Sequence, residues 1–145
     1  FDCGQQDINH YFQTQLSQDI KRKACRCYVL TPEKTSEVIG FMTLSASSVQ
    51  SSHIKAEMKK KLSKYPKIPS LLIGRMGVDK NYHGNGYGDL LVIWAFELAK
   101  KLPLGISLIE VEAKNEKLVS YYQRLGFILL ETQSSRYDAL VKKVE

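Results

Sequence analysis

The sequence predicts a mixed α/β protein with one domain spanning residues 1–145. Segments with the alternating pattern of strands come in turn with segments whose apolar residues recur at helical spacing. A chain of 145 residues is long enough to bury a core and is most simply a single domain. It has 43% hydrophobic and 25% charged residues, as globular proteins do. We find neither a signal peptide nor an apolar run of the roughly 20 residues that a membrane span needs, so we expect no membrane association.

The first part of the chain predicts a helix followed by two paired strands. Asp7 is a candidate N-cap for a helix whose apolar positions continue at helical spacing as far as Ile20. Residues 25–30 and 38–44 have the composition of strands and are separated by a turn-rich segment. We expect these two strands to form an antiparallel hairpin.

A polar connector and a lysine-rich helix are expected next. Residues 45–53 are mostly polar and are interpreted as the connector. Ile54, Met58 and Leu62 then recur every four residues, which places them on one face of a helix. Pro66 cannot continue a helix, so this helix is expected to end before it.

The second part of the chain predicts a β-loop-α-β unit followed by a helix and two strands. Its loop, HGNGYG, lies between an apolar strand and a helix on which Trp94 is expected to be a core residue. The expected elements are the strand 70–78, the loop 83–88, a helix from about residue 88 to 98, the strand 106–113, the helix 116–124 and the strands 127–131 and 137–144.

The cysteines and histidines show no pattern of metal ligands. Cys25 and Cys27 are two residues apart on an expected strand, so they share one face, and their spacing differs from the C-x2-C pair of zinc sites. The three histidines, His10, His53 and His83, have no ligand spacing either. We therefore expect no metal, and core thiols in the reducing environment of the cytoplasm.

Positive charge is concentrated in two short stretches of the sequence. The net charge is +6, and ten of the 21 lysines and arginines lie there. The members are Lys21, Arg22, Lys23 and Arg26 in the first stretch, and Lys55, Lys59, Lys60, Lys61, Lys64 and Lys67 in the second. Such stretches are either the solvated faces of helices or sites for a polyanion, such as RNA or an acidic partner segment.

The glycine loop matches neither of two common nucleotide-binding motifs. It lacks the Gly-Lys-Ser/Thr ending of a Walker loop and the third glycine of a dinucleotide fingerprint. Its alternating glycines let the backbone turn several N–H groups inward, and the helix that follows adds further donors. From the residues alone, the loop either holds an anion such as a pyrophosphate or is a plain turn.

Together with its neighbouring segments, the loop resembles a signature of the GNAT acetyltransferases, which use acetyl-coenzyme A. The signature is Gln/Arg-x-x-Gly-x-Gly/Ala, and HGNGYG fits it except at His83. A second stretch, NEKLVSYYQRLGF, resembles the family's Asn-x-x-Ala-x-x-Phe/Tyr-Tyr and Leu/Phe-Gly-Phe patterns, with Leu118 in place of the alanine. The resemblance implies the GNAT fold, a central mixed and mostly antiparallel sheet flanked by helices. The first strand of that fold is expected before Phe1 and is missing from this chain.

One branch of the family is more similar still. FDCG near the start, the basic stretch after it and KYPKIPSLLIGRMGVD before the loop resemble the acetyltransferase toxins of bacterial toxin–antitoxin pairs. The resemblance implies an enzyme that acetylates the α-amino group of aminoacyl-tRNA and so blocks translation. It also implies a ribbon-helix-helix antitoxin as partner, and a homodimer is common in this branch. The departures are Tyr82 for the commoner Trp and Gly77 for the commoner Ala.

The resemblance also implies which residues bind the coenzyme and the tRNA. The coenzyme is expected at Met76, Gly77, Val78, His83, Gly84, Asn85, Gly86, Tyr87, Gly88, Asp89 and Asn115, although Asn115 can also cap the next helix. Contacts to the tRNA are expected at Lys21, Arg22, Lys23, Arg26, Lys59, Lys60, Lys61 and Arg75. Arg75 is equally compatible with a structural ion pair.

The resemblance implies that Tyr122 is the general acid, because it occupies the position where the family often places one; packing alone is the other interpretation. A tyrosine with a pKa of about 10 stays protonated at neutral pH and can protonate a leaving thiolate whose pKa is about 8.5. Tyr121 is the alternative, since one of the two adjacent tyrosines should face the core. No general base stands out, and an α-amine with a pKa of about 8 does not need a strong one.

Two other functions remain compatible with the sequence. One is a GNAT enzyme that acts on a small amine or a protein N-terminus. The other is a non-catalytic GNAT-like module that binds RNA or a partner through its lysines.

Overall fold

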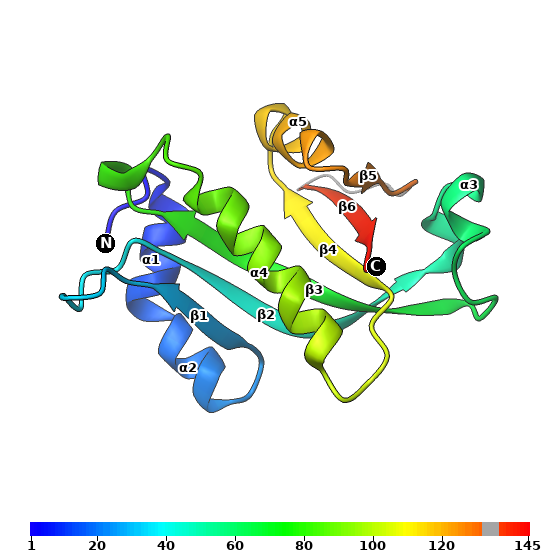
Figure 1. Cartoon of the computed structure of the whole chain (residues 1–145), viewed down its shortest axis with the longest axis horizontal. Helices are drawn as coiled ribbons and strands as arrows, with labels where there is room; N and C mark the ends of the chain where they lie inside the picture. The colour runs from blue at the N-terminus through cyan, green and yellow to red at the C-terminus, as the bar shows by residue number, and fades with distance from the viewer. Residues whose placement is uncertain (132–136) are drawn as a thin grey trace. The chain divides into compact units, whose positions relative to one another are not determined.

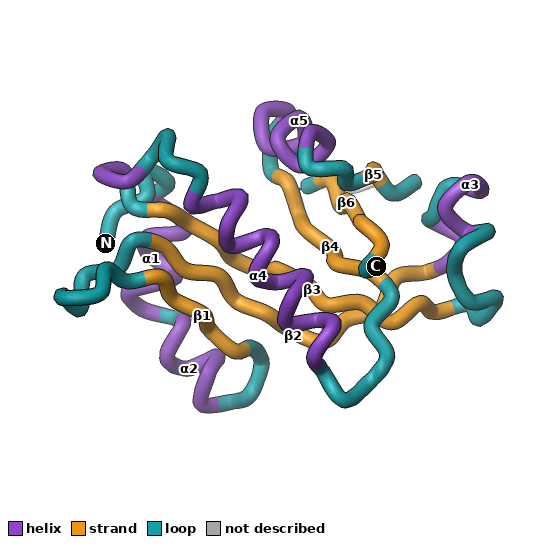
Figure 2. The backbone as a smooth tube through the Cα atoms, in the orientation of Figure 1, coloured by secondary structure: helices purple, strands orange, loops and turns teal. Residues whose placement is uncertain are grey.

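The computed structural model describes residues 1–131 and 137–145, and its strands form one six-stranded sheet in the order β1-β2-β3-β4-β6-β5 (Figure 1). The strands are β1 (Arg26–Leu30), β2 (Gly40–Gln50), β3 (Lys67–Val78), β4 (Leu108–Ala113), β5 (Ile128–Leu129) and β6 (Asp138–Lys143). The helices are α1 (Gln6–Thr14), α2 (Leu16–Lys21), α3 (Ala56–Lys59), α4 (Tyr87–Lys101) and α5 (Glu116–Arg124), with single 3-10 turns η1 (Ser51–His53) and η2 (Lys80–Tyr82). Figure 2 shows helices flanking a central sheet, which confirms the predicted fold class.

The chain forms two compact units. The first comprises Phe1–Ser45 and Ile73–Ala95, and the second comprises Ala46–Leu72 and Phe96–Glu145. The elements β2, β3 and α4 therefore contribute residues to both units. Within the described residues, no helix combines the length and the apolar character that crossing a membrane requires.

The first unit is built on the predicted hairpin, with α1 on one face and the start of α4 on the other. The antiparallel register pairs Val29 with Phe41, so Phe41 and Tyr28 lie on opposite faces. Phe41 is fully buried, and its ring centroid lies 4.7 Å from that of Phe12 in α1. On the other face, Trp94 of α4 meets Tyr28 edge-on at 5.2 Å. Trp94 is half-buried rather than a fully enclosed core residue.

The second unit packs α5 and the segment around α3 onto the strands β4, β6 and β5. Both strand pairs, β4–β6 and β6–β5, are antiparallel. Lys142 of β6 donates from Nζ to the carbonyl oxygen of Leu125 at 2.8 Å, which satisfies a carbonyl at the C-terminal end of α5. One apolar cluster of this unit, with each side chain at most 3% exposed, consists of Val49, Ile54, Ile68, Leu108 and Val141.

The expected first helix differs from the observed one in its cap and its length. Gln5 occupies the N-cap position, while Asp7 lies inside the first turn and accepts a hydrogen bond from the adjacent N–H of Ile8 at 2.9 Å. The helix is also interrupted, because α1 ends at Thr14 and α2 begins at Leu16. No glycine or proline marks this break, so the apolar periodicity alone does not reveal it.

The expected polar connector is in large part a strand. Residues 45–50 continue β2, and Val49 is buried in the core of the second unit. Ser47 donates to Glu110 Oε1 at 3.1 Å, so its hydroxyl is satisfied on the sheet. Small polar side chains can thus occupy a strand without the hydrophobic alternation that predicts one.

The expected lysine-rich helix is a single turn, α3. Ile54 is buried, and Met58 and Leu62 pack against the same apolar cluster, as their spacing predicts. However, the backbone N–H groups just after α3 bond to carbonyls three residues back, so tight turns replace a longer helix. Like charges four residues apart, such as Lys60 and Lys64, disfavour its continuation.

Candidate functional site

The glycine loop connects η2, at the end of β3, to the start of α4. Gly84 and Gly86 have φ angles of +80° and +81°, a region that residues with side chains rarely adopt. A Cβ atom at either position would meet no heavy atom within 4 Å. The requirement for glycine therefore comes from the φ angles, and the loop backbone is open to its surroundings.

The loop and the helix start supply hydrogen-bond donors. Among the residues that the structure describes, none accepts a hydrogen bond from the backbone N–H of Gly84, Asn85 or Gly86. The carbonyl of Gly86 accepts from the N–H of Leu90 at 3.0 Å, so α4 begins directly after the loop. A helix start carries roughly half a positive charge. These donors fit a pyrophosphate without any cationic side chain.

Side chains of the loop fix its own backbone. The amide nitrogen Nδ2 of Asn85 donates to the carbonyl oxygens of Tyr82 and His83 at 3.1 and 3.2 Å. The rings of Tyr82 and Tyr87 meet edge-on with centroids 6.0 Å apart. Gly88 and the acidic Asp89 belong to the first turn of α4.

The end of β3 is closely packed by the N-terminal segment. Met76, Gly77 and Val78 are all half-buried. A Cβ atom at Gly77 would lie 3.1 Å from Cγ2 of Ile8 and 3.3 Å from Cβ and Sγ of Cys3. The place of a side chain at Gly77 is therefore filled by α1 and the segment before it.

Tyr122, not Tyr121, is the tyrosine that faces the core. Tyr122 is 6% exposed, whereas Tyr121 is half-buried. Burial raises the pKa of Tyr122 to about 12, so its hydroxyl keeps its proton throughout the neutral range. This protonation state suits a general acid, although a tyrosine that merely packs would show it too. Tyr122 lies in the second unit, and the glycine loop lies in the first.

Asn115 is the N-cap of α5. Its Oδ1 accepts a hydrogen bond from the backbone N–H of Leu118 at 2.9 Å. Asn115 therefore caps α5, which is one of the two roles that the sequence allows for it. Contact with the coenzyme remains a prediction for this residue.

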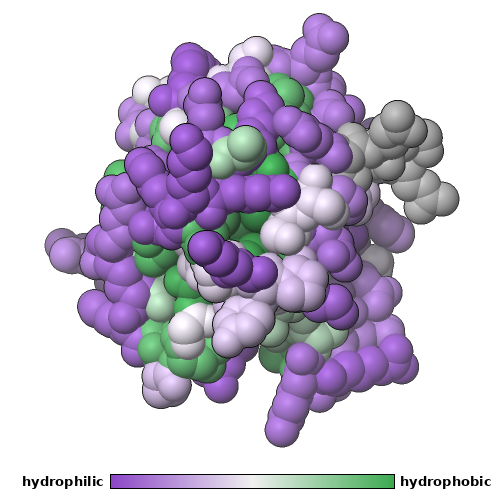
Figure 3. Space-filling model, turned by 90° about the vertical axis from the view of Figure 1, so that its right-hand side faces the viewer, coloured by the Kyte–Doolittle hydropathy of each residue, from purple (hydrophilic) through white to green (hydrophobic). Residues whose placement is uncertain are grey.

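The basic candidates divide between the two units. The basic residues of the first stretch (residues 21–26) and Arg75 belong to the first unit, and the lysines at positions 59–61 belong to the second. Each of these side chains is exposed. The guanidinium carbon of Arg75 lies 4.8 Å from the ring centroid of Tyr11, whose hydroxyl donates to Asp19 at 2.7 Å. Arg75 thus makes a cation–π contact where an ion pair was one alternative. Figure 3 shows that the face on the side of α3 is mostly hydrophilic.

A half-buried carboxyl in the second unit was not singled out from the sequence. Glu110 of β4 is hydrogen-bonded by Ser47 at 3.1 Å and by the fully buried Ser70 at 3.5 Å. Burial raises the pKa of Glu110 above its ordinary value. The signal in the sequence is a pair of glutamates, Glu110 and Glu112, that alternate with apolar residues in one strand.

The cysteines are free thiols, and Cys3 is buried. Cys3 and Cys27 belong to or pack against the apolar cluster around Phe41, as expected for core thiols. Among the described residues, no group of three His, Cys, Asp or Glu side chains is placed to hold a metal ion.

Comparison with known proteins identifies relatives over nearly the whole chain. The family model described as the acetyltransferase (GNAT) family matches residues 2–127. A protein named probable toxin TacT, from Sinorhizobium fredii (strain NBRC 101917 / NGR234), is 25% identical over 136 residues. That match covers 88% of this chain and 75% of TacT.

Solved structures are similar to this fold along almost its full length. AtaT complexed with acetyl-methionyl-tRNAfMet has a TM-score of 0.86 and 33% identity, covering 99% of this chain and 85% of AtaT. A tyrosine-to-phenylalanine mutant of AtaT, bound to the C-terminus of the antitoxin AtaR and acetyl-CoA, has a TM-score of 0.77 and 31% identity. It covers 99% of this chain and 83% of the mutant.

Proposed function

Because the chain belongs to the acetyltransferase (GNAT) family and is an acetyl-coenzyme A-dependent enzyme, we propose that it is a toxin that acetylates the α-amino group of aminoacyl-tRNA and blocks translation in the cytoplasm. The observation that carries this proposal is the similarity, over 99% of the chain, to a toxin solved with acetyl-methionyl-tRNAfMet. The exposed basic residues in both units are compatible with such a substrate.

The coenzyme is held mainly by backbone groups in this proposal. The N–H groups of Gly84, Asn85 and Gly86, with the start of α4, bind its pyrophosphate. The two positive φ angles hold the loop open, and Asn85 fixes its backbone from within. His83 stands where the family carries Gln or Arg, so binding does not depend on a permanent cation at that position.

In this proposal, backbone groups position the acetyl group and a tyrosine transfers a proton. Acetyl-coenzyme A, when bound, supplies the acetyl group as a thioester. The backbone N–H groups of Gly77 and Val78 orient the acetyl carbonyl and stabilise the negative charge that develops there. Tyr122 holds a proton at its hydroxyl and would donate it to the departing sulfur, and the proton that the amine loses as the amide bond forms would restore the phenol. The acceptor amine is already partly unprotonated at neutral pH, so orientation replaces a strong base.

The basic residues bind the phosphates of the acceptor arm in this proposal. Contacts with phosphates give affinity that falls with salt and depends little on sequence. An acidic segment of a ribbon-helix-helix antitoxin can use the same surface, which would exclude the substrate. The solved complex of AtaT with the C-terminus of its antitoxin supports a partner of this kind. We also expect a homodimer, which light scattering at several concentrations would detect.

The test is transfer of labelled acetyl from acetyl-coenzyme A to a pool of charged tRNA, beside the same pool after deacylation. Label in the charged pool alone would establish the reaction, and single purified tRNAs would then give the specificity. The matched control is Tyr122→Phe, which should lose most of the signal. Label in neither pool, with coenzyme binding intact, would instead favour a small amine or a protein N-terminus as acceptor.

A further inference from the structure

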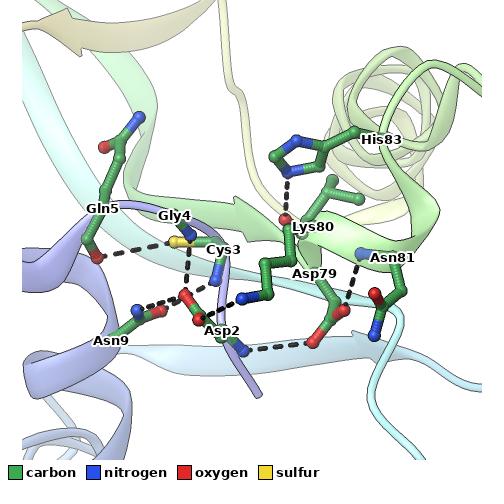
Figure 4. A network of polar contacts seen from close by, with 10 residues as sticks. Asp2, Cys3, Gly4, Gln5, Asn9, Asp79, Lys80, Asn81 and His83 are labelled. Carbon is green, nitrogen blue, oxygen red and sulfur yellow. Dashed lines mark hydrogen bonds and ion pairs between the residues drawn. The ribbon is translucent and has the colours of Figure 1, made fainter.

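The N-terminal segment is tied to the turn that precedes the glycine loop (Figure 4). The Asp79 carboxylate accepts one hydrogen bond from the backbone N–H of Asp2 at 3.1 Å and another from that of Asn81 at 2.9 Å. In return, the N–H of Lys80 donates to the carbonyl oxygen of Asp2 at 2.8 Å. Residues 77 positions apart in the sequence are thus joined at the entrance to the loop.

The Asp2 carboxylate is the centre of this network. Its Oδ1 accepts from the backbone N–H of Gly4 at 2.9 Å and from Nδ2 of Asn9 at 2.8 Å. Its Oδ2 lies 3.2 Å from Nζ of Lys80. The hydrogen bond from Gly4, followed by those from Asn9 and Lys80, lowers the pKa of Asp2 to about 2. The Lys80 pair is exposed and contributes little by itself, so the hydrogen bonds give Asp2 its fixed position.

His83 closes the turn from the other end. Its Nε2 lies 2.7 Å from the carbonyl oxygen of Val78. A carbonyl oxygen can only accept, so Nε2 carries the hydrogen. This hydrogen bond joins the first residue of the loop to the last residue of β3. The six residues from Val78 to His83 that form the turn are therefore held by the His83 bond and by the N-terminal segment.

We propose that Asp2 and His83 are positioning residues for the coenzyme loop. Asp2 acts through Asp79 and Lys80. His83, for which the family resemblance implied a contact with the coenzyme, acts in this proposal through the carbonyl of Val78. Both hold the turn between β3 and the loop in the shape from which the donors of residues 84–86 can bind a pyrophosphate. The inference rests on the proposed role of that loop, and it gives a function to FDCG and to the unusual His83.

The decisive variants are Asp2→Ala and His83→Leu. Asp2→Ala removes the carboxylate that fixes the N-terminal segment through Gly4, Asn9 and Lys80, and leaves only the backbone hydrogen bonds to the turn. His83→Leu removes the bond to Val78. We expect each to weaken the affinity for coenzyme A about five- to tenfold in calorimetry, since a hydrogen bond is worth about 1 kcal/mol. His83→Gln keeps a side-chain N–H donor and should restore affinity to within about twofold of wild type. The matched controls are Glu33→Ala and His10→Leu, which change exposed residues of the same unit.

A substrate without phosphates distinguishes a loss of loop positioning from a general loss of enzyme structure. S-acetyl-pantetheine carries the thioester but no pyrophosphate, so both tether variants should use it with the KM of the wild type. Unchanged coenzyme A affinity in both variants would overturn the proposal, as would an equal rise in KM for the two substrates. Gly86→Asp separates the proposed role of the loop in coenzyme binding from the positioning role of Asp2 and His83. If it retains coenzyme binding, the role of the loop itself fails; if it abolishes binding while the tether variants bind normally, only the positioning role fails.

Discussion

The ring of Tyr122 in α5 packs edge-on against that of Phe127, with ring centroids 5.5 Å apart. The contact continues to Phe96, whose ring lies 6.0 Å from Phe127. Aromatic packing therefore orients the Tyr122 ring, and its hydroxyl is not needed to keep the ring in place. A variant that removes only the hydroxyl isolates its chemistry from its packing.

We accordingly expect Tyr122→Phe to lower turnover by about 10² to 10⁴, the usual range for a general acid, with little change in coenzyme affinity. Single-turnover transfer of labelled acetyl measures the rate, and calorimetry measures binding. Tyr121→Phe is the control on the adjacent residue and should retain most activity. Wild-type turnover in Tyr122→Phe would remove this residue from the mechanism.

Gly86→Asp is expected to abolish coenzyme binding. The variant forces a residue with a side chain to a φ of +81° and places a negative charge among the donors that we propose bind an anion. Gly105→Asp adds the same charge at an exposed glycine of the second unit and should leave binding unchanged. Calorimetric titration with coenzyme A measures both, and retained affinity in Gly86→Asp would contradict the assignment of the loop.

Replacing the three consecutive lysines at positions 59–61 by alanine should weaken tRNA binding and flatten its dependence on salt. Each phosphate contact that is lost should reduce the slope of log affinity against log salt by about 0.7 to 0.9. The expected kinetic effect is a higher KM for charged tRNA with little change in kcat. Lys34→Ala in the β1–β2 connection is the single-site control. An unchanged salt slope in the triple variant would show that these lysines are only a solvated surface.

Glu110→Gln is expected to change the pH dependence of stability. Burial raises the pKa of Glu110 in the folded state above its ordinary value of 4.5, so the folded protein binds more protons than the unfolded chain. Its contribution is therefore most favourable below that ordinary pKa and is lost as the pH rises through the folded value. The glutamine variant keeps an acceptor for Ser47 and Ser70 without the charge. Its Tm at pH 7 should equal or exceed that of wild type.

Thermal unfolding from pH 4 to pH 8 measures this effect. The exposed Glu57→Gln in the same unit is the control and should follow the wild-type curve. A Tm at pH 7 clearly below that of wild type in Glu110→Gln would mean that the carboxylate, rather than its neutral form, stabilises the fold.

Local signals in the sequence predicted much of the fold. The helix 116–124 agrees with α5 at both ends, because Asn115 is a strong cap and the apolar spacing is regular. The glycines at 84 and 86 marked a loop with positive φ angles next to a helix start. By contrast, the serines within β2 concealed half of that strand, because their hydroxyls are satisfied by partners far away in the sequence.

Contacts between distant segments could not be predicted in the same way. Asp2 and Asp79 are 77 residues apart, and no sequence pattern around either residue predicts contact with the other. Which of Tyr121 and Tyr122 faces the core depended on the side of α5 that meets the rest of its unit, and burial shows that it is Tyr122. Their roles in the reaction depend on ligands and remain predictions.

The contact between Gly77, Ile8 and Cys3 also limits which residues position 77 can accommodate. A methyl group at position 77, where the family resemblance leads us to expect alanine, would lie only 3.1 Å from Ile8 Cγ2. The neighbours would have to move before that residue could be accommodated. Substitutions at positions 77 and 8 are therefore expected to be epistatic, since a smaller residue at position 8 would first have to make room. Glycine at position 77 therefore leaves the room that Ile8 and Cys3 occupy against the end of β3.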